Sequence, residues 1–82
     1  MNITIYSTTT CSFCHVLEAW LDKQGLSYTT KITDQDPEAM AEYLAINDGM
    51  IGVPFTVITD EKQHVTKILG FDQKKLKQAL DL

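Results

Sequence analysis

The chain has two cysteines among its 82 residues, Cys11 and Cys14, and His15 directly follows the second of them. Two cysteines at this spacing can form a redox-active dithiol, or they can supply two ligands to a metal ion. Together with His15 they also match the C-x-x-C-H pattern by which haem is attached covalently. The motif alone leaves these three chemistries open, so the choice depends on the elements that position it.

The residues around the motif predict a strand that leads directly into a helix. Apolar and polar residues alternate over 2–7, which is typical of a strand. The following helix ends near Gly25, a residue favoured just after a helix. Its apolar residues recur at helical spacing and predict one buried stripe, made of Phe13, Val16, Leu17, Trp20 and Leu21. A second strand is predicted over 27–32. The helix between the two strands forms a right-handed crossover, which makes the second strand parallel to the first.

A second helix is predicted from a clear start signal. Asp36 can cap the helix, and Pro37 suits its first position. Met40 and Tyr43 follow at helical spacing, and we expect both to pack against a sheet. Gly49 closes this segment.

The last third of the chain predicts a β-hairpin and a final helix. Strands are expected at 53–58 and 65–69, and Asp72 can cap the helix that follows. The buried side of that helix carries Leu76, Ala79 and Leu80. The order β-α-β-α-β-β-α predicts an α/β fold with a mixed four-stranded sheet covered by helices, in one domain over 1–82.

Composition narrows the classes of function. Eleven acidic residues oppose seven lysines, there is no arginine, and the net charge is −4. A nucleic-acid-binding protein would carry a basic face, so that class is not expected. No apolar run is long enough to span a bilayer, and the first residues lack the features of a signal peptide. We therefore expect a cytoplasmic monomer, in which a cysteine pair is rarely a permanent structural disulfide.

The position of the cysteines favours redox chemistry. A helix N-terminus stabilises a thiolate through its partial positive charge and its free N–H groups. Cys11 is predicted to lie at such a terminus, with Cys14 one turn further along the helix. We therefore predict Cys11 as the nucleophile and Cys14 as the thiol that resolves the mixed disulfide.

At this point the chain resembles the glutaredoxin family, within the thioredoxin-like superfamily. The resemblance covers nearly the whole chain and rests on four features: the opening strand, the motif from Cys11 to Cys14, Gly52-Val53-Pro54, and Leu69-Gly70-Phe71-Asp72. It implies a sheet in the order 2-1-3-4 with helices on both faces. It also implies that Pro54 follows a cis peptide bond and faces the dithiol, which leaves the backbone of Val53 free to pair with a peptide or with glutathione.

The resemblance implies a substrate- and glutathione-binding groove. Its predicted members are Thr8, Ser12, Phe13, Val53, Pro54, Gly70, Phe71 and Asp72. Several of them depart from the family pattern: Thr8 stands where a lysine is common, Ser12 where a proline is common, and Phe13 where a tyrosine is common. Asp72 matches the family's aspartate near the glutathione amino group.

The sequence leaves two alternatives for the electron donor that reduces the protein. The prediction favours a glutaredoxin that reduces protein disulfides or glutathione mixed disulfides, with glutathione as co-substrate. The alternative is a redoxin of the NrdH type, a class that accepts electrons from thioredoxin reductase and donates them to ribonucleotide reductase. The chain shares Gly70 and Phe71 with that class.

The metal alternatives find less support in the rest of the sequence. Haem attachment is opposed by the β-rich second half and by the lack of an export signal. A zinc site would need further ligands, and His64 lies in the predicted hairpin, far along the chain from the cysteines. The Cys11-Ser12 pair resembles glutaredoxins that share a [2Fe–2S] cluster between two monomers, which is the remaining cofactor alternative. We predict no metal site, no required cofactor, and a surface position for His15.

Overall fold

The structure is a computed structural model and describes residues 1–82. The elements are β1 (Asn2–Ser7), α1 (Ser12–Lys23), β2 (Thr29–Ile32), α2 (Pro37–Ile46), β3 (Phe55–Thr59), β4 (Val65–Leu69) and α3 (Gln73–Leu80). Its strands form one mixed sheet in the order β2-β1-β3-β4, as expected. β1 is parallel to β2 and antiparallel to β3, which is antiparallel to β4. None of the helices is long and apolar enough to cross a membrane.

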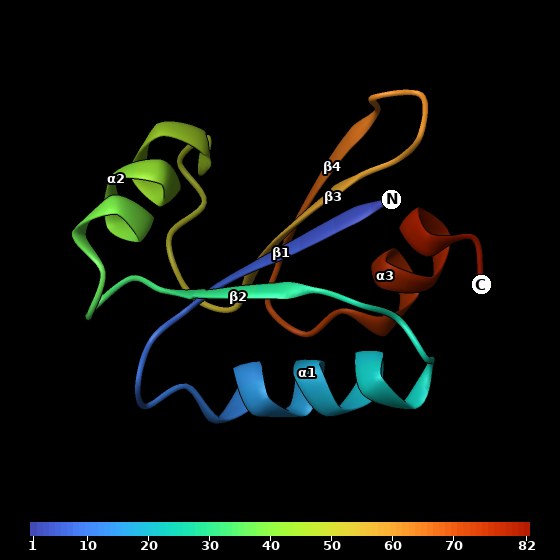
Figure 1. The fold of residues 1–82 in the computed structure, drawn as a ribbon, viewed down its shortest axis with the longest axis horizontal. Helices are drawn as coiled ribbons and strands as arrows, with labels where there is room; N and C mark the ends of the chain where they lie inside the picture. Colours follow the sequence, from blue (N-terminus) through green and yellow to red (C-terminus); the bar gives the residue numbers. More distant parts are fainter.

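Helices cover both faces of the sheet (Figure 1). α1 and α3 pack on one face, where a core of aliphatic side chains joins them to the strands. α2 packs on the other face, where an aromatic cluster of Tyr6, Tyr43 and Phe55 is buried. The larger core consists of Ile3, Ile5, Leu17, Leu21, Ile58, Ile68, Leu76 and Leu80.

The buried stripe of α1 differs from the predicted one. Cys14, Leu17 and Leu21 are buried, whereas Phe13 is 64% exposed and Val16 is 47% exposed. Each of these two residues precedes a buried residue by one position, which turns its side chain about 100° away from the buried face. Trp20 is offset in the same way but is half-buried, because it packs against Phe71.

On α2 the predicted start is confirmed, while one predicted packing residue is wrong. The carboxylate of Asp36 accepts the N–H of Glu38 at 3.0 Å and caps the helix. Tyr43 is buried as expected, but its buried partner on the helix is Ala39 rather than Met40, which is 37% exposed. Ala39 and Tyr43 are four residues apart and therefore lie on one face.

Strand pairing brings three loops together at one end of the sheet. Tyr6 at the end of β1 pairs with Phe55 at the start of β3, and Phe55 pairs with Leu69 at the end of β4. β3 begins at Phe55, two residues later than predicted, and β2 begins at Thr29 rather than residue 27. The N-terminus of α1 reaches the same end of the sheet (Figure 1).

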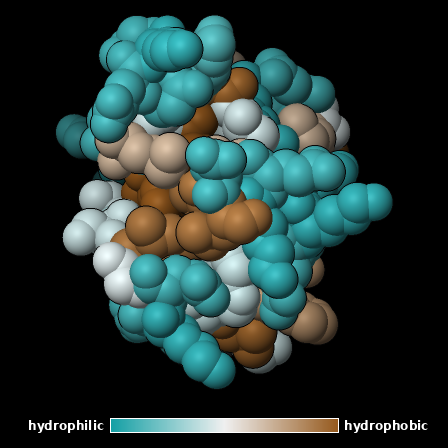
Figure 2. Space-filling view, turned by 90° about the vertical axis from the view of Figure 1, so that its right-hand side faces the viewer, coloured by the Kyte–Doolittle hydropathy of each residue, from teal (hydrophilic) through white to brown (hydrophobic).

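Both chain termini lie at the other end of the molecule (Figure 1). Figure 2 views the molecule from that end and shows an apolar patch bordered by hydrophilic surface. Met1 and Leu82 are both more than half exposed there. The cysteine motif is therefore remote from the termini.

Candidate active site

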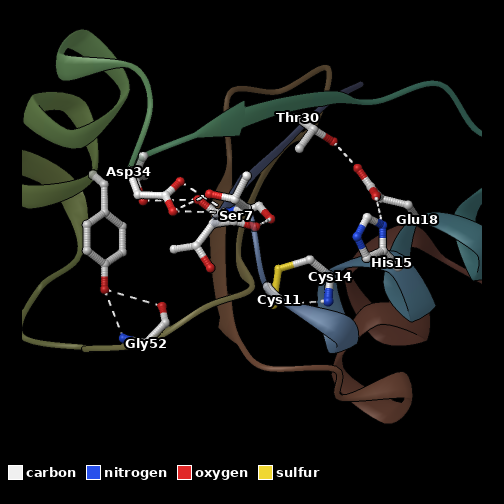
Figure 3. Close-up of a disulfide and its surroundings, with 12 residues drawn as sticks. Ser7, Cys11, Cys14, His15, Glu18, Thr30, Asp34 and Gly52 are labelled. Carbon is white, nitrogen blue, oxygen red and sulfur yellow. Dashed lines mark hydrogen bonds and ion pairs between the residues drawn. A yellow bond between two sulfur atoms is a disulfide. The ribbon is translucent and has the colours of Figure 1, made fainter.

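Cys11 and Cys14 form a disulfide at the N-terminus of α1 (Figure 3). Cys11 is the N-cap residue, with extended backbone, and its Sγ accepts the backbone N–H of Cys14 at 3.2 Å. Cys14 is 1% exposed, whereas Cys11 is partly accessible to solvent. The two sulfurs therefore differ in access, and a reaction partner can approach only the first.

The loop that precedes Cys11 is fixed by the segment that follows β2. Both carboxylate oxygens of Asp34 accept the N–H of Thr9, at 3.1 and 3.2 Å, and one of them also accepts its hydroxyl (Figure 3). The carbonyl of Ser7 accepts the N–H of Thr33 at 2.8 Å and its hydroxyl at 3.0 Å. Sequence reasoning missed Asp34, because its partner lies 25 residues away.

A second loop, from Met50 to Pro54, enters the same end of the sheet. The Val53–Pro54 peptide bond is cis, as the resemblance implied. The carbonyl of Pro54 accepts the N–H of Gly70 at 2.8 Å, so two predicted groove residues are brought together. The N–H and C=O of Val53 make no hydrogen bond within the chain. This peptide edge is thus available to an extended partner.

Phe71 and Asp72, which were predicted as groove residues, have structural roles in the fold. The ring of Phe71 packs edge-on against Trp20, with the ring centroids 6.2 Å apart. The Oδ1 atom of Asp72 accepts the N–H of Lys75 at 3.1 Å and caps α3, as the sequence predicted. The second carboxylate oxygen of Asp72 has no partner within the chain.

Two apolar side chains are exposed in the segments at the dithiol end of the sheet. Phe13 follows Cys11 by two residues and is 64% exposed, and Ile51, next to Gly52, is 83% exposed. Ser12 is also exposed, and Thr8, whose carbonyl accepts the N–H of Cys11 at 3.3 Å, is partly buried. No lysine occupies this loop, so it offers no positive charge beside the dithiol.

Neither histidine makes a hydrogen bond to a sulfur atom. Nδ1 of His15 is 3.5 Å from the carboxylate of Glu18, which also accepts the Thr30 hydroxyl at 2.5 Å (Figure 3). His64 pairs with Asp60 in the β3–β4 hairpin, at the opposite end of β3. His15 is exposed, as predicted, and no group of three or more His, Cys, Asp or Glu side chains is gathered at one place.

A polar network supports the aromatic cluster behind the site. The hydroxyl of Tyr6 donates to Glu42 at 3.0 Å, and Lys31 donates to the same carboxylate at 2.6 Å. Burial and this carboxylate raise the pKa of Tyr6. The pKa of Glu42 is lowered, mainly by the hydrogen bond from Lys31 and to a smaller extent by the hydrogen bond from Tyr6. The network joins β1, β2 and α2.

An accessible N-cap cysteine bonded to a buried one, beside a cis-proline loop on a mixed sheet, defines a thiol–disulfide oxidoreductase of the thioredoxin-like class. The sequence model of the glutaredoxin family matches residues 3–65. The chain belongs to the glutaredoxin family.

Relatives agree with this assignment. The chain is 40% identical over 69 residues to mycoredoxin 1 of Corynebacterium glutamicum, and the match covers 84% of each chain. Its fold is similar to that of the NrdH-redoxin of Escherichia coli, with a TM-score of 0.76, 27% identity, and coverage of 95% of this chain and 93% of that one. A glutaredoxin from Methanosarcina mazei Go1 gives a TM-score of 0.81 at 21% identity, over 99% of this chain and 79% of that one, and supports the fold.

Proposed function

We propose that the protein reduces disulfides through a dithiol cycle, with Cys11 as nucleophile and Cys14 as resolving thiol. The Cys11 thiolate attacks one sulfur of a substrate disulfide, and the other substrate sulfur leaves as a thiol. The Cys14 thiolate then attacks Sγ of Cys11, which releases the second substrate thiol. Two electrons pass to the substrate, and the enzyme is left with the Cys11–Cys14 disulfide.

The difference in access between the two sulfurs is the observation that carries this proposal. Cys14 is 1% exposed, so a bulky disulfide cannot reach it, whereas Cys11 is accessible at the helix N-terminus. The N–H of Cys14 already points at Sγ of Cys11 at 3.2 Å and would stabilise a thiolate there. The dithiol itself carries both electrons, so the cycle needs no metal or organic cofactor.

Variants of the two cysteines test the assignment. Cys11→Ser should abolish reduction of a glutathione mixed disulfide, because it removes the attacking sulfur. Cys14→Ser should still form a mixed disulfide with a protein substrate but should accumulate it, detectable by mass spectrometry. A Cys11→Ser protein that retains turnover, or a mixed disulfide found on Cys14, would contradict the proposed roles.

Glutathione is the first candidate donor. The free N–H and C=O of Val53 can pair with the extended backbone of glutathione. The free carboxylate oxygen of Asp72 can accept a hydrogen bond from the ammonium group of glutathione. Two molecules of glutathione would return the electrons and become oxidised glutathione. Thr8 offers no positive charge for a carboxylate, so this binding would rest mainly on backbone pairing.

Thioredoxin reductase is the second candidate donor. It is favoured by the similarity to the NrdH-redoxin of Escherichia coli, a glutaredoxin-like protein described as having a thioredoxin-like activity profile. The two donors can be compared by NADPH consumption with the same disulfide substrate. Turnover with glutathione and glutathione reductase supports the first donor. Turnover only with thioredoxin reductase would make thioredoxin reductase the donor in place of glutathione. Ribonucleotide reductase would then be the expected recipient of the electrons.

A further inference from the structure

The hydroxyl of Tyr43 anchors the loop that carries Val53 and Pro54. It accepts the N–H of Gly52 at 2.9 Å, and its single proton can be donated to the carbonyl of Met50 at 3.1 Å or to that of Gly52 at 3.3 Å. A tyrosine hydroxyl has one proton and also accepts hydrogen bonds, so it can bind an N–H and a carbonyl of the loop at the same time. One side chain of α2 therefore holds backbone groups on both sides of Ile51.

The ring of Tyr43 is itself fixed. It is 8% exposed and packs against Phe55 and Tyr6, with centroid separations of 5.6 and 6.2 Å. Packing on both neighbours leaves the hydroxyl in one position. A rigid ring can thus define where the loop lies.

The loop has few other attachments. Ile51 is 83% exposed and contributes little burial, and Gly52 has a φ of +135°, which side chains rarely allow. On the far side of Val53, the carbonyl of Pro54 is held by the N–H of Gly70 at 2.8 Å. Hydrogen bonds to Tyr43 and from Gly70 therefore hold the chain on either side of Val53, whose own N–H and C=O are unpaired.

We propose that Tyr43 is a positioning residue that sets the orientation of the Val53 peptide groups for an extended substrate backbone. The inference rests on the proposed function, since it assumes that substrates pair with Val53 while Cys11 attacks their disulfide. Tyr43 makes no contact with the sulfur atoms, so its hydroxyl affects substrate alignment and leaves thiol reactivity unchanged.

The test compares Tyr43→Phe with Tyr6→Phe. Both changes remove one hydroxyl from the same aromatic cluster, but the Tyr6 hydroxyl binds Glu42 and makes no contact with the loop. Insulin has a peptide backbone that can pair with Val53, whereas the small disulfide 5,5′-dithiobis(2-nitrobenzoic acid) has none. Insulin reduction is followed at steady state with dithiothreitol as reductant, whereas the small disulfide is mixed with the pre-reduced protein alone, because dithiothreitol would reduce it directly.

Tyr43→Phe should raise KM for insulin about 3- to 10-fold, the effect of about one lost hydrogen bond, with kcat nearly unchanged. Its rate with the small disulfide and the pH profile of Cys11 alkylation should match those of the unaltered protein. Tyr6→Phe should leave KM for insulin within about 2-fold, since no loop contact is lost. Hydrogen exchange should show a less protected Gly52 amide in Tyr43→Phe alone.

Equal KM values for the two variants, or an unchanged Gly52 amide in Tyr43→Phe, would overturn the inference. So would a parallel loss of activity toward both substrates, which would indicate a general structural effect. The proposed function is tested separately, by Cys11→Ser. It would be contradicted if Cys11→Ser retained disulfide reduction, whatever the result with Tyr43→Phe.

Discussion

Thr56 carries a buried hydroxyl with no hydrogen-bond partner. It lies in the middle of β3, paired with Ile5 of β1 and Ile68 of β4, and all three side chains are at most 1% exposed. Directly paired residues share a face of the sheet, so this hydroxyl points into the aliphatic core under α1 and α3. Replacing the hydroxyl by a methyl group should therefore stabilise the fold.

The expected gain follows from the cost of the unpaired hydroxyl. Leaving such a group buried costs about 1–3 kcal/mol, and part of the gain is offset by fitting a slightly different shape into a tightly packed core. We expect Thr56→Val to raise the free energy of unfolding by about 1–2 kcal/mol. For a domain of this size, 1 kcal/mol corresponds to about 4–8 °C in Tm, so Tm should rise by about 4–16 °C.

Thr33→Val is the matched control, because Thr33 is also buried but its hydroxyl donates to the carbonyl of Ser7 at 3.0 Å. Losing this bond should lower the free energy of unfolding by about 0.5–1.5 kcal/mol. Urea denaturation of the oxidised proteins measures both changes under one redox state. A loss of stability in Thr56→Val, or the same sign for both variants, would refute the reasoning.

Three further predictions follow from other contacts. Asp34→Ala should speed hydrogen exchange of the Thr9 amide, measured by NMR, and slow disulfide exchange several-fold, because the loop before Cys11 loses its anchor; an unchanged amide would contradict this role. The pKa of Glu42 is lowered in the fold, first by Lys31, so its contribution to stability is present above the ordinary glutamate pKa of about 4.3 and is lost as the pH falls below it. Glu42→Gln should flatten that acid-side loss in denaturation curves, whereas an identical pH dependence would argue against it. Leu17→Ala removes a fully buried core side chain and should cost about 2–5 kcal/mol in urea denaturation, and a cost below 1 kcal/mol would not fit the packing.

Features with local sequence signals were predictable. The cap residues Asp36 and Asp72 each act on an N–H two or three residues away, and the structure confirms both. The strand-to-helix position of Cys11 also follows from periodicity on either side of it. The cis bond before Pro54 came from the family resemblance rather than from any local rule.

Features that depend on distant contacts were not predictable. Helical spacing alone could not show that Phe13 and Val16 lie outside the buried face of α1, because an apolar stripe on a helix is wide and its edges depend on what covers it. The sequence identified Tyr43 as a packing residue but gave no sign of the bonds of its hydroxyl to Gly52. Asp34 was missed for the same reason, since its partner is brought near only by the pairing of β1 with β2.

The two loops at the dithiol end are anchored by one stretch of chain, residues 33–43. Asp34 holds the loop before Cys11, and Tyr43 holds the loop before Pro54. The thiol itself, however, is positioned by the cap of α1, which makes no use of α2. Changes in α2 can therefore alter the presentation of the Val53 peptide edge while the environment of the Cys11 sulfur stays the same. Under the proposed function, a change confined to α2 should therefore alter how substrates align without altering thiol reactivity, whereas a change at Asp34 should affect the loop of the thiol itself.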